Sequence, residues 1–383
     1  MQVIEPYPVI PDSARAGYHK AGQGIERIRN RKSHSTRNSE DRKSGPTLKH
    51  SRFATFLLNS HHLYFCMKRA SLRFSRFLFA LSAVGLLLAV VPLCSAGIAD
   101  DVHAAVVQNR LDWAEAALKA YLAQDGQTPE YLDALSWLAR GYLDGNQPNR
   151  AQDYAKQIEA QAHQQLLKRS LDAEPHLPDA LGAAIEVEAQ ALVSRGQRVQ
   201  AIAMLRGNLA RYRATSIRAR LQKNLNLISL TGRPAPPLNI AQYLGPKPND
   251  LSALKGSPVL LFFWAHWCAD CKSEGPIITQ LRTEFGPKGL TVVAPTQLYG
   301  YAARGEPANP QAELAWIDRV WQHFYPGLGG IPVPISAVNF NNYGCSTTPT
   351  LVLLDRSGRV ALYHPGVLPY EALRAAVEKT LAN

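Results

Sequence analysis

The sequence is short of cysteine. Five of the 383 residues are cysteine, and only Cys268, Cys271 and Cys345 lie beyond residue 96. Three cysteines are too few for the disulfide framework of a small secreted domain, and too few for a four-thiolate zinc site. Beyond residue 96 no second CxxC pair and no HxxxH spacing is present to complete a metal site. We therefore expect neither a disulfide-rich scaffold nor a bound metal.

A basic excess is missing from most of the chain. The net charge is +12, but residues 1–96 hold fifteen lysines and arginines against five acidic residues. Residues 97–383 carry 27 basic and 25 acidic side chains and are nearly neutral. A nucleic-acid-binding domain carries a basic surface that attracts phosphates. We therefore expect no nucleic-acid partner.

Long apolar runs are also rare. Within residues 67–96, four basic side chains precede an apolar run from Phe77 to Val91, and small residues follow it. About 15 apolar residues are short for a bilayer span of roughly 20, and this layout is typical of a signal peptide. We expect cleavage near Ala96 or Ala99 and export to the periplasm or another extracytoplasmic space. An uncleaved signal anchor in the membrane is the alternative.

Residues 1–66 do not fit in front of a signal peptide. They have no sustained apolar period, and Met67 is a good start methionine. We interpret them as a start-site artefact or a disordered extension. Cys94 follows the bulky Leu93, which is unsuited to a lipoprotein cleavage site, so we expect no lipidation.

Residues 97–230 predict an all-α domain. Apolar or alanine positions recur at helical spacing over residues 111–123, 131–145, 150–171 and 185–212, with a break expected near 173–182. The small residues resemble those of degenerate tetratricopeptide (TPR-like) helical hairpins, which would offer a protein-binding surface. A generic helical bundle is the alternative. The prolines of residues 231–238 predict a stiff linker after the helices.

Residues 239–383 predict an α/β domain. The continuous apolar run at 258–265 is typical of a strand buried on both faces, and 289–296 predicts a second. A strand–turn–strand pattern surrounds residues 356–358. Helices are expected at 268–286, 312–325 and 369–382, with a kink at Pro276 in the first of them.

The cysteine pair stands where the first strand meets the following helix. Cys268 would lie at the helix start, where free N–H groups and the helix dipole stabilise a thiolate. Cys271 lies one turn further and is placed to resolve a mixed disulfide, so the two can form a redox-active disulfide. A merely structural disulfide is the alternative. One CxxC pair in an exported chain favours redox chemistry.

These motifs resemble a known family. The stretch "DLSALKGSPVLLFFWAHWCADCKSEGP" and the later "TTPT" before a strand resemble the thioredoxin superfamily, and within it the TlpA/ResA-like exported thiol–disulfide oxidoreductases. The resemblance covers residues 236–383 and not the helical region. It implies a thioredoxin-like fold and a thiol–disulfide oxidoreductase that needs no cofactor.

The resemblance also assigns site residues. Pro349 matches the family's cis-proline, which faces the CxxC pair and helps to dock substrate, with Thr348 before it and Trp267 as active-site support. Glu274 occupies the place of the family's acid and would take a proton from Cys271. The alternative for Glu274 is a carboxylate on the helix surface. Phe262 stands where ordinary thioredoxins keep a buried acid.

Some features depart from the family. The residues between the cysteines are Ala269 and Asp270; the acid should disfavour a thiolate, and Lys272 partly opposes it, so the redox potential cannot be transferred by analogy. Residues 297–344 form a long, aromatic-rich segment that frames a substrate groove or pads the fold. Cys345 is expected to be a small buried side chain, with a third redox thiol as the alternative.

The functional prediction combines these points. We expect a protein-disulfide reductase in which Cys268 attacks, Cys271 resolves and Glu274 handles the proton. The partners would be disulfide-bearing exported proteins, with apocytochrome c as a candidate in cytochrome c biogenesis, and a membrane electron donor of DsbD/CcdA type. A further protein would bind the helical domain. The alternatives are a disulfide oxidase of the same fold and a TPR-like scaffold with a secondary thioredoxin-like module.

Overall fold

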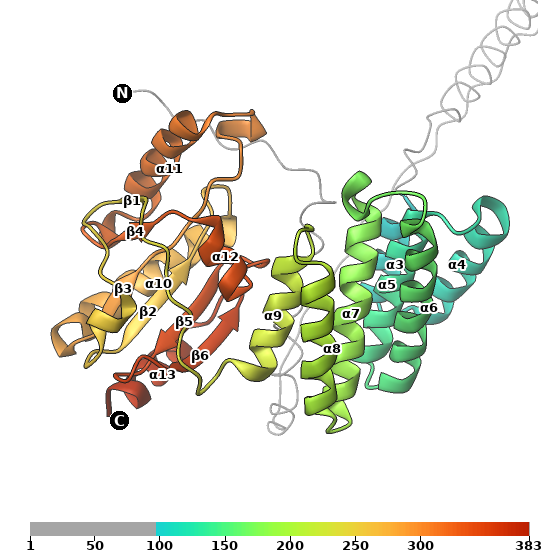
Figure 1. Ribbon diagram of the computed structural model, residues 1–383, viewed down its shortest axis with the longest axis horizontal. Helices are drawn as coiled ribbons and strands as arrows, with labels where there is room; N and C mark the ends of the chain where they lie inside the picture. Colours follow the sequence, from blue (N-terminus) through green and yellow to red (C-terminus); the bar gives the residue numbers. More distant parts are fainter. Residues whose placement is uncertain (1–96, 383) are drawn as a thin grey trace, which may run out of the picture. The chain divides into compact units, whose positions relative to one another are not determined.

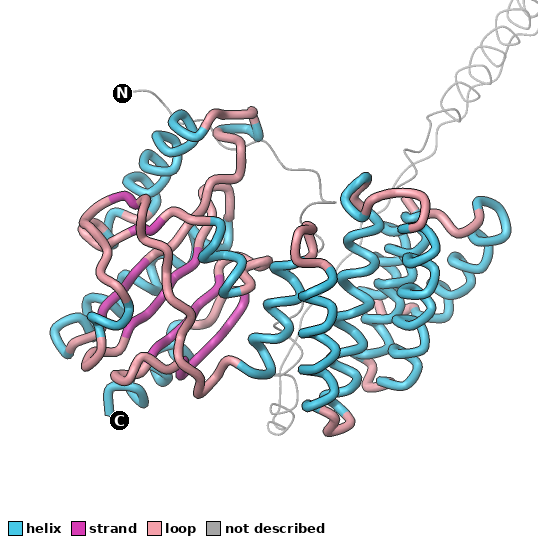
Figure 2. The backbone as a smooth tube through the Cα atoms, viewed as in Figure 1, coloured by secondary structure: helices cyan, strands magenta, loops and turns pink. Residues whose placement is uncertain are grey.

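The computed structural model describes residues 97–382. The expectations for residues 1–66, for the signal segment at 67–96 and for Cys94 lie outside the described residues. Helices joined by short loops are the only secondary structure from Gly97 to Ser229, and strands begin at Tyr243 (Figure 2). The predicted order, an all-α part followed by an α/β part, is confirmed. None of the helices between residues 97 and 382 is both long and apolar enough to cross a membrane.

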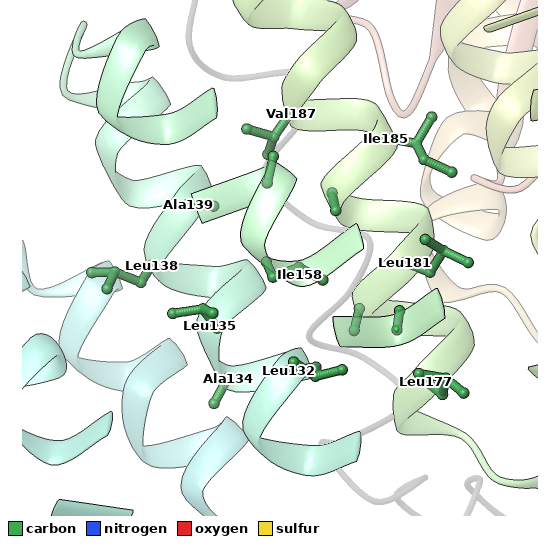
Figure 3. Packing of buried hydrophobic residues seen from close by; sticks show 14 of the residues in the cluster. Leu132, Ala134, Leu135, Leu138, Ala139, Ile158, Leu177, Leu181, Ile185 and Val187 are labelled. Carbon is green, nitrogen blue, oxygen red and sulfur yellow. The ribbon is translucent and has the colours of Figure 1, made fainter. Parts of the chain in front are cut away.

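The all-α part is a series of helices in which chain neighbours pack together (Figure 1). The helices are α3 Ile98–Val107, α4 Leu111–Asp125, α5 Pro129–Asp144, α6 Pro148–Leu166, α7 His176–Ser194, α8 Arg198–Arg211 and α9 Arg218–Ser229. Fully buried alanines such as Ala139 and Ala151 keep the side-chain layer between helices thin. Leucines and isoleucines, including Leu135 and Ile158, fill the space between α5, α6 and α7 (Figure 3). This packing, rather than helix propensity, stabilises the array.

The break in the helical array lies slightly earlier than the sequence predicted. A break was expected near 173–182, and the structure has it between the end of α6 at Leu166 and the start of α7 at His176. The Glu174 carboxylate accepts hydrogen bonds from the backbone N–H groups of His176 and Leu177, at 2.9 and 2.7 Å. Those N–H groups have no partner inside the helix, so this acid fixes the helix start.

The helical stretch expected at 185–212 contains a turn. It is two helices, α7 and α8, separated at Gly196, whose φ of +78° lies in the left-handed region that glycine adopts without strain.

The α/β part is built on a four-stranded sheet of order β3-β2-β5-β6. Its strands are β2 Val259–Phe263, β3 Thr291–Val293, β5 Thr350–Leu354 and β6 Val360–Pro365, and its helices are α10 Ala269–Phe285, α11 Pro310–Phe324, α12 Ala337–Tyr343 and α13 Tyr370–Ala382. The central strand β2 runs parallel to β3 and antiparallel to β5. The short strands β1 Tyr243–Leu244 and β4 Val333–Pro334 pair separately. The predicted strands and helices are therefore present.

Both faces of the sheet are covered. Leu260 and Phe262 of β2 pack in one apolar cluster with α10, α11 and α13. Leu261 and Phe263 point to the opposite face and pack with α12 and with Cys345. Because successive strand residues alternate between faces, the uninterrupted apolar run of β2 is what a doubly covered strand requires.

Candidate active site

Cys268 is placed by the junction of β2 and α10. The indole Nε1–H of Trp264 donates to the Ala294 carbonyl at 3.1 Å, and the Thr296 hydroxyl donates to the Trp264 carbonyl at 2.8 Å. These bonds fix the chain just after β2, so that Cys268 becomes the N-cap of α10. Its sulfur therefore lies at the positive end of the helix.

The two cysteines of the motif form a disulfide. Cys268 and Cys271 are bonded, with their Cα atoms 5.3 Å apart. The backbone N–H of Cys271 donates to Cys268 Sγ at 3.0 Å. Cys268 is 4% exposed and Cys271 is fully buried. An incoming sulfur can therefore reach Cys268 more readily than Cys271.

The segment before β5 meets the disulfide. The peptide bond between Thr348 and Pro349 is cis, as predicted. The carbonyl oxygen of Thr348 lies 3.4 Å from Cys268 Sγ. The Thr350 hydroxyl donates to the Thr347 carbonyl at 2.6 Å, and Gly366 N–H donates to the Pro349 carbonyl at 2.7 Å, which holds the segment. The structure thus brings the Thr348 carbonyl to Cys268, while the docking role of Thr348 and Pro349 stays a prediction.

Glu274 is a buried acid on the same helix as the cysteines. Its side chain is 1% exposed, so the alternative of a helix-surface carboxylate is wrong. Burial raises the pKa of Glu274 to about 7, the Leu368 N–H opposes the rise, and the charge of Asp270 adds to it. That N–H lies 3.4 Å from Glu274 Oε2. Residues three apart share a helix face, so Glu274 lies on the side of α10 that carries Cys271.

Two residues adjacent to Cys271, Asp270 and Lys272, carry opposite charges. Burial lowers the pKa of Lys272 to about 8, and its Nζ lies 4.6 Å from the ring centre of Phe324 on α11. Asp270, half-buried in the first turn of α10, raises the pKa of Glu274. The expected effect of Asp270 on the Cys268 thiolate stays a prediction.

An aromatic cluster adjoins the motif. The half-buried ring of Trp267 meets Tyr299 edge-on at 5.6 Å, and Tyr299 and Tyr301 both contact the ring of His266. The tyrosines belong to the long segment at 297–344, whose aromatic content the sequence analysis noted. That reasoning missed Glu313, which is 1% exposed beside His266. The signal was available, because Glu313 falls on the apolar stripe of α11 formed by Ile317, Val320 and Trp321.

Cys345 lies apart from this chemistry. It is buried in the cluster on the sheet face opposite to the one that holds Cys268 and Cys271. Burial raises the pKa of its thiol well above the usual value. A thiol that stays protonated is a poor nucleophile, which favours the interpretation of Cys345 as a small buried side chain. Among residues 97–382, no three His, Cys, Asp or Glu side chains are grouped as metal ligands would be.

Several known proteins are similar to the C-terminal part of the chain. Residues 231–296 match the AhpC/TSA family. The thiol:disulfide interchange protein DsbE of Xylella fastidiosa is 27% identical over 156 residues, which cover 40% of this chain and 71% of DsbE. The thioredoxin-like protein YneN of Bacillus subtilis is 30% identical over 138 residues, covering 36% of this chain and 72% of YneN. The thiol-disulfide oxidoreductase ResA of Bacillus thuringiensis is 26% identical over 152 residues, covering 39% of this chain and 77% of ResA.

These similarities confirm the predicted family and the thioredoxin-like fold of the C-terminal part. They also agree with a redox role for the CxxC pair at the start of α10. The chain belongs to the thioredoxin-like proteins, and the relatives similar to its C-terminal part include the thiol-disulfide oxidoreductase ResA.

Proposed function

We propose that the protein is exported and reduces disulfides of other exported proteins. The observation that carries this proposal is the placement of Cys268 at the N-cap of α10, next to the Thr348–Pro349 peptide, with the buried acid Glu274 on the same helix. The signal-like sequence at 67–96 supports export.

The reaction begins from the dithiol form. The Cys268 thiolate attacks one sulfur of the substrate disulfide, forming a mixed disulfide and releasing the other substrate sulfur as a thiolate that takes up a proton. The N–H of Cys271 and the N-terminus of α10 stabilise the attacking thiolate. The more exposed of the two sulfurs is therefore also the activated one.

The second step regenerates the intramolecular disulfide. Cys271 loses its proton to the Glu274 carboxylate and attacks Cys268 Sγ, which expels the second substrate sulfur as a thiolate that takes up a proton. Two electrons have then passed from the Cys268–Cys271 pair to the substrate, and the protons of the two product thiols come from solvent and from Glu274. An acid with a pKa of about 7 can accept and release this proton near neutral pH. A membrane electron donor of DsbD/CcdA type would reduce the pair again.

The proposal also names a class of substrate and gives the helical part a binding role. Exported proteins with a disulfide to be opened, apocytochrome c among them, are the substrate class. The array from α3 to α9 would bind a further protein partner, as TPR-like hairpins do.

Reduction of insulin tests the activity. Wild type, with dithiothreitol as reductant, should accelerate insulin precipitation, and Cys268→Ser should not; equal rates would reject the mechanism. The redox potential of the Cys268–Cys271 pair tests the direction. A value near about −270 mV agrees with a reductase, whereas one near about −120 mV would indicate the oxidase alternative.

A further inference from the structure

A buried carboxylate holds the loop that follows β3. Glu313 on α11 accepts hydrogen bonds from two consecutive backbone N–H groups, those of Tyr299 and Gly300, at 2.5 and 2.8 Å. Each oxygen of the carboxylate takes one bond. Gly300 has a φ of +85°, a conformation that exposes consecutive N–H groups to one acceptor at little cost in glycine.

His266 does not neutralise this carboxylate. Its Nε2 lies 3.4 Å from Glu313 Oε1 but makes no hydrogen bond. Burial lowers the pKa of His266 to about 4, and the charge of Lys272 adds to the effect, so the imidazole is neutral near pH 7. The two loop N–H groups are therefore the main partners of a group that is 1% exposed. Removing their acceptor would leave these two N–H groups without their partner in the fold.

The loop that Glu313 holds reaches the active site through one aromatic ring. Tyr299 meets both Trp267 and His266 at 5.6 Å between ring centres. Trp267 is the residue before the nucleophile Cys268, and its Nε1–H is buried without a partner. The half-buried ring of Trp267 leaves part of a rigid aromatic surface open beside Cys268, and such a surface suits contact with a peptide.

We propose that Glu313 is a positioning residue for protein substrates. By binding the N–H groups of Tyr299 and Gly300 it presses the Tyr299 ring against Trp267, and this pair of rings forms a fixed wall beside Cys268 along which a substrate peptide lies. The inference rests on the proposed reduction of protein disulfides. In it, binding of the substrate peptide depends on the two rings, whereas disulfide exchange depends on the cysteines. A small disulfide has no peptide to bind and should react without the wall.

The test compares a protein disulfide with a small one. The substrates are insulin and hydroxyethyl disulfide, and the variants are Glu313→Gln and Tyr299→Ala. Both variants should raise KM for insulin about ten-fold, as expected when one buried hydrogen bond or ring contact is lost, with kcat unchanged within about two-fold. The rate with hydroxyethyl disulfide and the redox potential should stay as in wild type.

Two matched variants serve as controls. Tyr299→Phe keeps the ring and should behave as wild type. Glu306→Gln makes the same chemical change at an exposed site of the same segment and should also be silent. A KM for insulin that is unchanged in Glu313→Gln would overturn the proposal. An equal loss of activity with insulin and with hydroxyethyl disulfide would overturn it too, since that result indicates a merely structural role.

A spectroscopic readout does not depend on activity. The Trp267 indole N–H resonance in a proton–nitrogen spectrum, assigned by its loss in Trp267→Phe, should shift in Glu313→Gln and stay in place in Tyr299→Phe and Glu306→Gln. An unshifted resonance in Glu313→Gln would refute the positioning of Tyr299. A wild type that reduces neither disulfide would instead refute the proposed function, and the resonance would still decide the role of Glu313.

Discussion

Replacing Glu274 with glutamine should make the protein's stability less dependent on pH. Burial raises the pKa of Glu274 from 4.5 to about 7. The unfolded chain therefore loses this proton at lower pH than the folded chain does. Between about pH 4.5 and 7 the folded state binds more protons, so wild-type stability falls as pH rises.

The size of the effect follows from the shift in pKa. A difference of about 2.5 units corresponds to about 3 kcal/mol at about 1.4 kcal/mol per unit. The contribution of the buried acid is complete below about pH 4.5 and lost above about pH 7. Glutamine has the same shape and does not titrate, so Glu274→Gln should gain about 3 kcal/mol relative to wild type between pH 4 and pH 8.

Urea unfolding of the oxidised protein measures this difference. Wild type and Glu274→Gln are compared at intervals from pH 4 to pH 8, with Glu306→Gln as an exposed control whose difference from wild type should not change. The relevant quantity is the change with pH of the gap in unfolding free energy. A gap that stays constant within about 0.5 kcal/mol, the usual scatter of such comparisons, would refute the claim that burial keeps Glu274 protonated.

Three further changes have defined outcomes. Cys271→Ser should trap a mixed disulfide between Cys268 and the substrate, seen as a higher band in a non-reducing gel, because the resolving thiol is gone; absence of that band from Cys268→Ser is the control. Asp270→Asn removes a negative charge near the Cys268 thiolate, which stabilises the reduced form and should raise the redox potential by up to about 20 mV. This is the equivalent of about 1 kcal/mol for a half-buried charge pair. A lower redox potential in the variant would contradict the charge argument. Leu281→Ala opens a cavity at a fully buried position of α10 and should cost about 2–5 kcal/mol in urea unfolding, whereas a cost under about 1 kcal/mol would contradict the packing described for this face of the sheet.

Local signals made the centre of the site predictable. The apolar run of β2 predicted a strand buried on both faces, and the motif that follows it placed Cys268 at a helix start. Strand ends and helix caps depend on a few adjacent residues, so the sequence carries them directly. The burial of Glu274 could also be predicted, because a residue three positions after Cys271 lies on the same face of the helix as Cys271.

Contacts between distant segments were not predictable in the same way. The start of α7 was misplaced because a single acid, Glu174, caps it in a stretch whose prolines suggested a break. Glu313 could be assigned to the apolar stripe of α11 from its spacing, but its partners are backbone N–H groups of Tyr299 and Gly300. Backbone groups carry no sequence signal, so only the folded chain identifies them.

The active site therefore draws on segments with different constraints. The end of β2 and the first turn of α10 hold the Cys268–Cys271 disulfide, and the proposed sulfur chemistry needs both cysteines. The loop after β3 supplies Tyr299, and α11 supplies the carboxylate that fixes it. On the proposed function and the proposed role of Glu313, changes in residues 297–313 would alter which peptides bind without altering the reaction at the disulfide. Substrate choice and sulfur chemistry would then depend on separate parts of the chain.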